Sequence, residues 1–293
     1  MQRIVCALAS RSRPDDSRVR VPGTLWTGCR LESRRLAQDG PGRSVRGGGQ
    51  SSAAATVQPE ATRTGMNIEI LDYTESSIGD LCLRRRELLS QPGTFVTEVT
   101  VNHEFLMSSH NTLSERELSR RALAFHGGRG LSVLVGGLGL GYTAYEAVAS
   151  PTVARVDVVE LLPQVISWLD RGLHPLADTL SGDDRVRVIQ DDVFRRLTSE
   201  PAESYDVVLL DVDHSPDELL DPRNGMFYGA DGLAVARRHL ADRGVLAVWS
   251  SAGSEAFLRA LRSVFSEACA ESVTWENELI DEKQDDVVFL ARR

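Results

Sequence analysis

Two patterns of hydrophobic and polar residues follow each other along the chain, and the first begins near Met66. Over residues 66–112, apolar and polar side chains alternate, which is the period of strands with one buried face. The alternation is clearest in three segments, 67–73, 80–84 and 94–101. Gln91-Pro92-Gly93 supplies a turn before the last of these segments. We therefore expect a small antiparallel β unit over residues 66–112.

From residue 113 onward, helical stretches alternate with short runs that are apolar almost throughout. Ser114-Glu115-Arg116-Glu117 has the form of a capped helix start. The apolar runs are 131–135, 156–160, 186–189, 206–211 and 245–249. Strands that are buried on both faces and connected by helices form a doubly wound, mostly parallel sheet. The pattern thus predicts an α/β fold for residues 113–293, with ligands bound at the carboxyl ends of the strands.

Residues 1–65 differ from the rest of the chain in composition. They hold 11 Arg and five acidic residues, whereas residues 66–293 hold 22 basic and 37 acidic residues. Gly-rich and Ser-rich stretches interrupt them, and no apolar period holds across them. Their apolar start is shorter than the core of a signal peptide. Two interpretations stay open: residues 1–65 are a disordered, Arg-rich leader, or translation begins at Met66.

Composition argues against several classes of protein. No apolar run approaches the roughly 18 residues that a transmembrane helix needs, so no membrane partner is expected. The net charge of −9, carried by the region after residue 65, argues against a nucleic-acid partner. The six histidines show no ligand spacing, so no metal is expected. The four cysteines form no CxxC pair and indicate reduced thiols in the cytoplasm: Cys6, Cys29, Cys82 and Cys269.

A glycine-rich loop, 136–141, lies between the first apolar run and the next helix. Glycines there let a ligand approach the backbone, and a helix N-terminus offers free N–H groups. Two kinds of ligand site compete for this loop. A dinucleotide site would use Gly139, Gly141 and Ala144, and an adenosyl-sulfonium site would use Gly137, Gly139 and Gly141. A third interpretation is that the glycines only turn the chain.

Three acidic residues end the strands that follow the glycine loop. Glu160, 19 residues after Gly141, can accept hydrogen bonds from both hydroxyls of a ribose. Asp192 can accept from an adenine amino group, or it can cap the helix that follows. Asp211 ends the next strand. A nicotinamide dehydrogenase has no standard need for Asp192 or Asp211, so the series favours an adenosyl-sulfonium ligand.

These residues resemble the spermidine synthase (polyamine aminopropyltransferase) family, and the resemblance covers roughly residues 67–293. It is carried by the glycine loop, Val159-Glu160, Asp191-Asp192, 205–211 and Phe227-Tyr228. Ser114-Glu115-Arg116-Glu117 is similar to the start of the family's first long helix. The resemblance implies a class I adenosylmethionine-dependent methyltransferase-like Rossmann fold after the small β unit. It also implies a homodimer.

The resemblance further implies a co-substrate, decarboxylated S-adenosylmethionine, or S-adenosylmethionine itself. The residues that would bind it are Gly136, Gly137, Gly139, Gly141, Glu160 and Asp192. Asp211 would be the catalytic acid that binds a small-molecule amine and takes its proton, because only a neutral amine is a nucleophile. Tyr228 would assist by hydrogen bonding near that amine, and Asp213 would bind the substrate. The products would be an aminopropylated amine and methylthioadenosine.

The chain departs from the family at the amine end of the site. Gly139 stands where the family loop has Asp, and Arg120-Arg121 stand where it has Tyr and His. Trp249-Ser250-Ser251 replace Gln-Gly-Glu, and Asp211 is followed by Val212-Asp213 instead of Ser-Ser-Asp. Two other functions therefore stay open. One is a methyltransferase, although Val135 stands where methyltransferases place an acid; the other is a non-catalytic protein that binds an adenosyl ligand.

Overall fold

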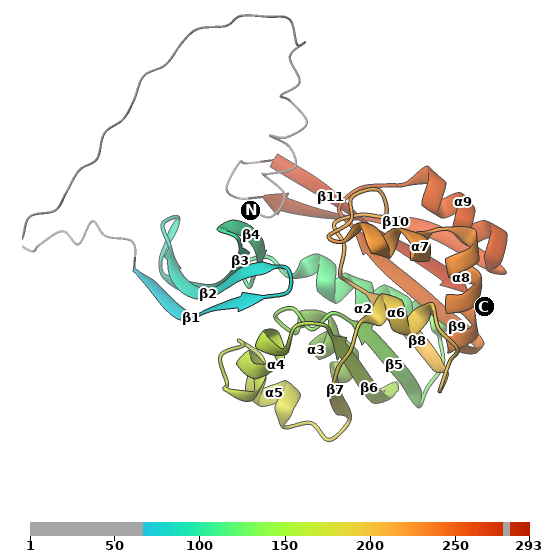
Figure 1. Ribbon diagram of the computed structural model, residues 1–293, viewed down its shortest axis with the longest axis horizontal. Coiled ribbons are helices and arrows are strands. Elements are labelled where there is room, and N and C mark those ends of the chain that lie inside the picture. Colours follow the sequence, from blue (N-terminus) through green and yellow to red (C-terminus); the bar gives the residue numbers. More distant parts are fainter. Residues whose placement is uncertain (1–66, 278–281) are drawn as a thin grey trace, which may run out of the picture. The chain divides into compact units, whose positions relative to one another are not determined.

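The computed structural model describes residues 67–277 and 282–293 (Figure 1). The interpretations of residues 1–65 lie outside the described residues. Within the part that is described, no helix is both long and apolar enough to cross a membrane.

The first sheet is antiparallel and has four strands in chain order. They are β1 (Ile68–Ser76), β2 (Gly79–Leu88), β3 (Gln91–Val101) and β4 (Glu104–Ser108). Leu81 and Leu83 of β2 are buried in the same hydrophobic cluster as residues of the helices that pack against the larger sheet. The turn between β2 and β3 comes earlier than Gln91-Pro92-Gly93, because Leu88 already pairs with Gln91 after a register shift at the end of β2.

The second sheet has seven strands in the order β10-β11-β9-β8-β5-β6-β7. The strands β9, β8, β5, β6 and β7 are parallel, while β11 runs antiparallel to β9 and to β10. Their bounds are β5 (Leu131–Gly136), β6 (Val153–Glu160), β7 (Val186–Gln190), β8 (Tyr205–Leu210), β9 (Leu240–Ser250), β10 (Glu267–Asn277) and β11 (Glu282–Arg292). The predicted mostly parallel sheet, with a small antiparallel sheet before it, is confirmed.

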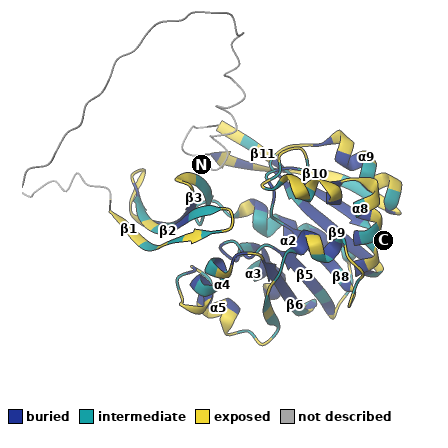
Figure 2. Ribbon diagram, viewed as in Figure 1, coloured by how far each residue is buried: buried dark blue, intermediate teal, exposed yellow. Residues whose placement is uncertain are grey.

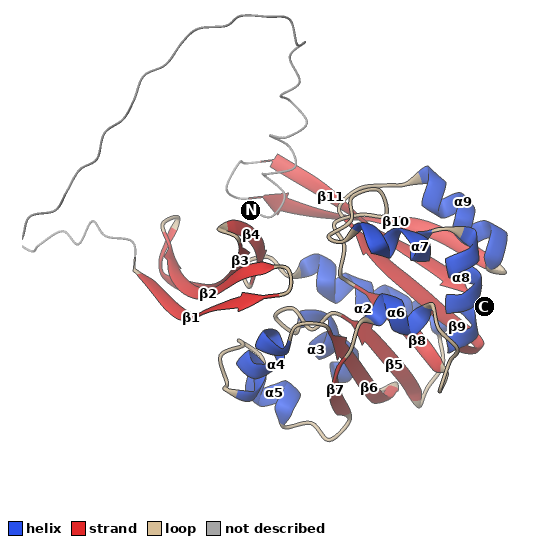
Figure 3. Ribbon diagram, in the orientation of Figure 1, coloured by secondary structure: helices blue, strands red, loops and turns tan. Residues whose placement is uncertain are grey.

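Helices connect the strands (Figure 3), and the central strands of the larger sheet are largely buried (Figure 2). Alternate strand residues face two separate hydrophobic clusters. One cluster packs α2 (Leu113–His126), α3 (Tyr142–Ala149), α4 (Pro163–Asp170) and α5 (Ala177–Ser181). The other packs α6 (Val193–Leu197), α7 (Gly225–Tyr228), α8 (Ala230–Ala236) and α9 (Glu255–Val264). On β5, Val133 and Val135 belong to the first cluster and Leu134 to the second. Because these strands are buried on both faces, their sequences are continuous apolar runs.

The order of the strands indicates where along the carboxyl ends of the sheet a ligand would bind. The chain passes from β5 outward through β6 to β7 and then returns to the other side of β5 as β8. In open α/β sheets, ligands bind at the carboxyl ends of the strands where the order reverses in this way. That point lies between β5 and β8, next to the glycine loop and Asp211.

Candidate active site

The residues predicted to bind the adenosyl ligand, and Asp211, the predicted catalytic base, lie at the ends of neighbouring strands. Gly136 pairs with Leu210 of β8 on one side and with Val159 of β6 on the other. Glu160 is the last residue of β6, and Asp211 follows β8 directly. The sheet therefore brings the glycine loop, Glu160 and Asp211 together at one edge.

Gly137 is the glycine of this loop that lies against the backbone of Asp211. Its φ is +89°, a conformation that favours glycine. A Cβ atom at this position would lie 3.0 Å from the carbonyl oxygen of Asp211. The loop thus approaches the residue that follows β8 so closely that a side chain at Gly137 would push against the backbone there. Gly139, in turn, faces the sulfur of Met107 from β4, which a Cβ at Gly139 would meet at 3.5 Å.

Glu160 ties the glycine loop to the start of α4. Its Oε2 accepts a hydrogen bond from the N–H of Leu138 at 2.8 Å, and its Oε1 accepts from the N–H of Leu162 at 2.8 Å. Burial raises the pKa of Glu160, and these backbone hydrogen bonds oppose the shift. The N–H groups of Gly139 and Leu161 act in the same direction, so backbone donors from the glycine loop and from the start of α4 surround this carboxylate.

Asp192 is the N-cap residue of α6, as one of the two interpretations of the sequence proposed. Its Oδ1 accepts hydrogen bonds from the N–H groups of Phe194 at 2.9 Å and Arg195 at 3.1 Å. Its neighbour Asp191 forms ion pairs with Arg195 and, at 3.7 Å, with Arg196. Burial raises the pKa of Asp191, but the hydrogen bonds from Arg195 and from the N–H of Asp192, together with the charges of Arg195 and Arg196, outweigh burial and lower that pKa.

Asp211 is fixed to the centre of the site through its backbone and its side chain. Its N–H donates to the carbonyl oxygen of Gly136 at 3.1 Å. Its Oδ2 accepts a hydrogen bond from the hydroxyl of Thr143 on α3 at 2.9 Å. Sequence analysis did not point to Thr143. Its place two residues after Gly141, at the start of the helix that follows the loop, was the available signal.

Asp213 and Tyr228, the other two residues predicted for the amine, contact each other. Asp213 accepts from the hydroxyl of Tyr228 at 2.9 Å, the N–H of Leu220 at 2.7 Å and the side-chain amide of Asn224 at 3.0 Å. Both are buried. Burial raises the pKa of Asp213, and burial together with the nearby Asp213 raises that of Tyr228. In this structure the pair holds the loop after Asp211 to α7.

The two arginines that replace Tyr and His in α2 have acidic partners. Arg120 forms ion pairs with Glu117 and, at 2.7 Å, with Glu146 of α3. Arg121 pairs with Glu117 at 3.0 Å and with Glu271 of β10 at 3.2 Å. These ion pairs offset the positive charge of the two guanidinium groups.

A further acid that sequence analysis did not single out lies near the end of β9. Asp286 of β11 is buried and accepts a hydrogen bond from the hydroxyl of Ser114 at the start of α2. The next residue of β11, Val287, pairs with Ser250, the last residue of β9. No sequence pattern marked Asp286, because its position depends on an antiparallel strand that the apolar runs did not predict.

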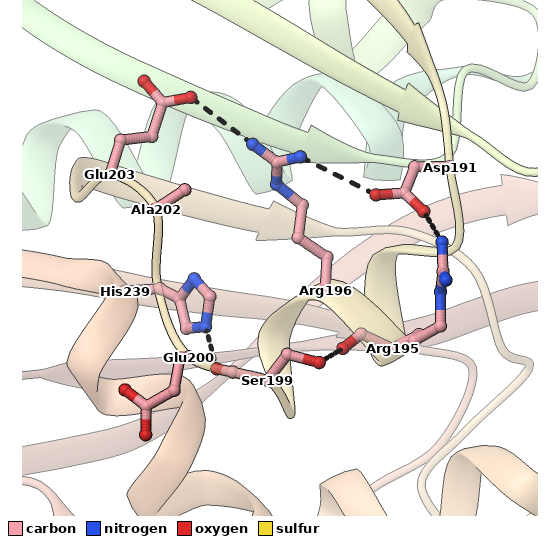
Figure 4. A pocket seen from close by; sticks show the side chains of 8 residues that line it. All are labelled: Asp191, Arg195, Arg196, Ser199, Glu200, Ala202, Glu203 and His239. Carbon is pink, nitrogen blue, oxygen red and sulfur yellow. Dashed lines mark hydrogen bonds and ion pairs between the residues drawn. The ribbon is translucent and has the colours of Figure 1, made fainter.

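A cavity of about 300 Å³ lies elsewhere, beside α6 and the loop that follows it (Figure 4). It is lined by Asp191, Arg195, Arg196, Ser199, Glu200, Ala202, Glu203 and His239. Arg196 bridges Asp191 and Glu203, and His239 contacts the carbonyl oxygen of Ser199 at 2.9 Å. Its charged groups pair largely with one another, and it contains none of the residues predicted for the site. Over the described ranges, no cluster of three or more His, Cys, Asp or Glu residues is placed to hold a metal ion.

Comparison with known proteins adds local sequence similarity and a fold. No protein-family model matches the chain. Polyamine aminopropyltransferase 2 of Streptomyces coelicolor is 39% identical over 124 residues, which are 42% of this chain and 22% of that protein. A polyamine aminopropyltransferase of Prochlorococcus marinus strain MIT 9312 is 28% identical over 119 residues, which are 41% of this chain and 40% of that protein. The matches thus span well under half the length of these curated relatives.

Solved structures are similar over a larger part of the chain. The spermidine synthase from Thermotoga maritima has a TM-score of 0.58 at 13% identity, covering 76% of this chain and 72% of that chain. A spermidine synthase in complex with the transition-state analogue AdoDATO has a TM-score of 0.59 at 13% identity, with the same coverage. The fold is that of the spermidine synthases. A probable spermidine synthase from Corynebacterium glutamicum, with a TM-score of 0.52 at 16% identity over 76% of this chain and 80% of that one, shares it.

The resemblance to the spermidine synthase family that the motifs predicted is therefore confirmed, in local sequence and in fold.

Proposed function

We propose that this chain transfers an aminopropyl group from decarboxylated S-adenosylmethionine to a small-molecule amine and releases methylthioadenosine. The observation that carries the proposal is the position of Asp211. Its N–H is bonded to Gly136 and its carboxylate to Thr143, at the point where the strand order reverses. One carboxylate is thereby held where a fold of this kind places its ligand.

The residues around Asp211 fit the adenosyl part of such a donor. Gly137 leaves open the space that a Cβ would fill beside the carbonyl oxygen of Asp211. We assign the carboxylate of Glu160, at the end of β6 beside the glycine loop, to the ribose hydroxyls, which would share it with the backbone N–H groups that already donate to it. Asp192 uses Oδ1 to cap α6, and we assign Oδ2 to the adenine amino group.

Asp211 would perform the proton chemistry of the transfer. The donor supplies a propyl carbon that its sulfonium activates. Asp211 binds the acceptor as an ammonium ion and takes a proton from it, because only the neutral amine has a lone pair to attack with. As nitrogen forms its bond to carbon, the carbon–sulfur bond breaks and its electrons stay on the sulfur of methylthioadenosine. Asp211 then passes its proton to solvent.

Tyr228 and Asp213 contribute to this proposal mainly through the loop that they hold. Their mutual hydrogen bond fixes the segment that follows Asp211. The direct contacts with the amine that the resemblance implies for them stay predictions, and the hydroxyl oxygen of Tyr228 can accept from the amine while its proton is donated to Asp213.

A product screen tests the function. The full chain is supplied in turn with decarboxylated S-adenosylmethionine and with S-adenosylmethionine, each with a panel of diamines and polyamines, and products are identified by mass spectrometry. Methylthioadenosine together with an amine enlarged by one aminopropyl group is the expected result. S-adenosylhomocysteine with a methylated product would instead establish a methyltransferase. Binding of methylthioadenosine without turnover of either donor would establish a non-catalytic protein.

The same proposal includes a homodimer in the cytoplasm, as the family resemblance implies. Light scattering on the purified chain measures its mass in solution, and a mass of one chain at concentrations used for turnover would overturn the dimer. Localisation of a tagged chain tests the compartment.

A further inference from the structure

Thr143 connects the glycine-loop helix to the residue that follows β8. It is the second residue of α3 and is buried, with 4% of its surface exposed. Its hydroxyl donates to Oδ2 of Asp211 at 2.9 Å, across 68 positions of the chain. In a helix interior a threonine hydroxyl commonly bonds a carbonyl of the preceding turn. Thr143 instead directs its hydroxyl at the carboxylate of the candidate site.

Thr143 is itself held in place by α2. The hydroxyl of Ser119, which is fully buried, donates to the carbonyl oxygen of Thr143 at 2.7 Å. Since threonine is β-branched, few rotamers are open to it in a helix. The bond from α2 thus fixes the backbone from which the Thr143 side chain extends, and the β-branch restricts the directions open to its hydroxyl.

We propose that Thr143 is a positioning residue that sets the orientation of the Asp211 carboxylate for its reaction with the amine. This inference rests on the proposed function. The terminal torsion of an aspartate is broad and roughly two-fold, so an unrestrained carboxylate samples many orientations. The bond to Thr143 selects one of them and, because a carboxylate accepts about four hydrogen bonds, leaves capacity for the substrate. Such preorientation lowers the barrier of a step that depends on alignment.

The test compares two substitutions at Thr143. Thr143→Val removes the hydroxyl and keeps the shape, whereas Thr143→Ser keeps the hydroxyl. We expect Thr143→Val to lower kcat about tenfold, in line with the loss of one hydrogen bond to a charged group, and to leave the KM for the adenosyl donor unchanged. Thr143→Ser should recover most of the rate. Thr198→Val, which removes a hydroxyl bonded to the carbonyl of Phe194 at 2.7 Å, is the matched control and should retain wild-type kcat.

A double-mutant cycle shows whether Thr143 acts through Asp211. Combined with Asp211→Ala, Thr143→Val should cost little further rate, because the group that it orients is gone. The same tenfold loss in both backgrounds, or a Thr143→Ser variant as slow as Thr143→Val, would overturn the positioning role while leaving the proposed function intact. If the wild-type chain forms no aminopropylated amine, that result overturns the proposed function and this inference together.

Discussion

The hydroxyl of Tyr228 donates a hydrogen bond to Oδ2 of Asp213, and it joins the loop after β8 to α7. Three further hydrogen bonds, from Leu220 and Asn224, reach the same carboxylate. An acid with this many donors is stabilised in its charged form, yet burial raises its pKa. The buried pair therefore couples the conformation of this loop to pH.

Tyr228→Phe should lower stability, and more so at higher pH. The lost bond to a charged group is worth about 2 kcal/mol. Because the pKa of folded Asp213 is raised above its unfolded value, the stability linked to it is present at low pH and is lost as pH rises through the folded pKa. Without the hydroxyl that pKa rises further. Urea unfolding should thus show a larger deficit at about pH 8 than at about pH 4.

Tyr73→Phe is the matched control for this measurement. The hydroxyl of Tyr73 also donates to an aspartate, Asp80, at 3.0 Å, but at an exposed position. An exposed bond of this kind competes with water, so we expect a change below about 0.5 kcal/mol at either pH. Equal deficits for the two variants would contradict the buried coupling.

Gly137→Ala should disrupt the approach of the glycine loop to β8. Alanine in the left-handed region costs roughly 1–2 kcal/mol in any surroundings. At Gly137 the new Cβ must also displace the carbonyl oxygen of Asp211, which lies at 3.0 Å. Gly93→Ala has the same backbone strain, with φ +88°, but nothing lies within 4 Å of its Cβ. We expect Gly137→Ala to be the less stable variant and to lose affinity for methylthioadenosine, measured by calorimetry, while Gly93→Ala retains it.

Glu160→Ala should weaken the binding of adenosyl ligands by about 1–3 kcal/mol, because the ribose hydroxyls lose their acceptor. It should also reduce stability, since the N–H groups of Leu138 and Leu162 lose theirs. Glu200→Ala removes an exposed carboxylate paired with Arg238 and serves as the control. Calorimetric titration with methylthioadenosine gives both affinities, and an unchanged value for Glu160→Ala would remove Glu160 from the site.

The features that could be predicted from the sequence are those that depend on a local pattern of residues, namely the parallel strands and the glycine loop. Runs buried on both faces marked β5, β6, β7, β8 and β9, and the glycines marked the loop at their carboxyl edge. It did not predict β10, which is largely exposed and carries three Glu residues, or β11. In β11 a charged and mostly exposed first half precedes the apolar run 287–291, most of which is buried.

Contacts between distant residues were not predictable from such patterns. Thr143 reaches Asp211 only because α3 and β8 lie next to β5 in the folded sheet. The hydrogen bonds that Asp213 accepts from Leu220, Asn224 and Tyr228 were not predicted either, and its contact with a substrate stays a prediction. The contact of Thr143 depends on the order of the strands, which periodicity does not fix. The partners of Asp213 lie 7 to 15 positions further along the segment between β8 and β9, whose conformation periodicity does not give either.

Asp211→Asn separates the proposed chemistry from a purely structural role. Asparagine keeps the shape and can still accept a hydrogen bond from Thr143, but it lacks the negative charge and the base. General-base catalysis contributes typically 10²–10⁴-fold, so kcat should fall by about that factor while affinity for methylthioadenosine changes little. Raising the pH should partly restore the rate, because more of the free amine is then already neutral. If Asp211 only supports the loop that follows it, the variant will instead lose stability and keep its turnover. An Asp211→Asn chain with near wild-type kcat would therefore exclude the proposed proton transfer, whatever the acceptor amine.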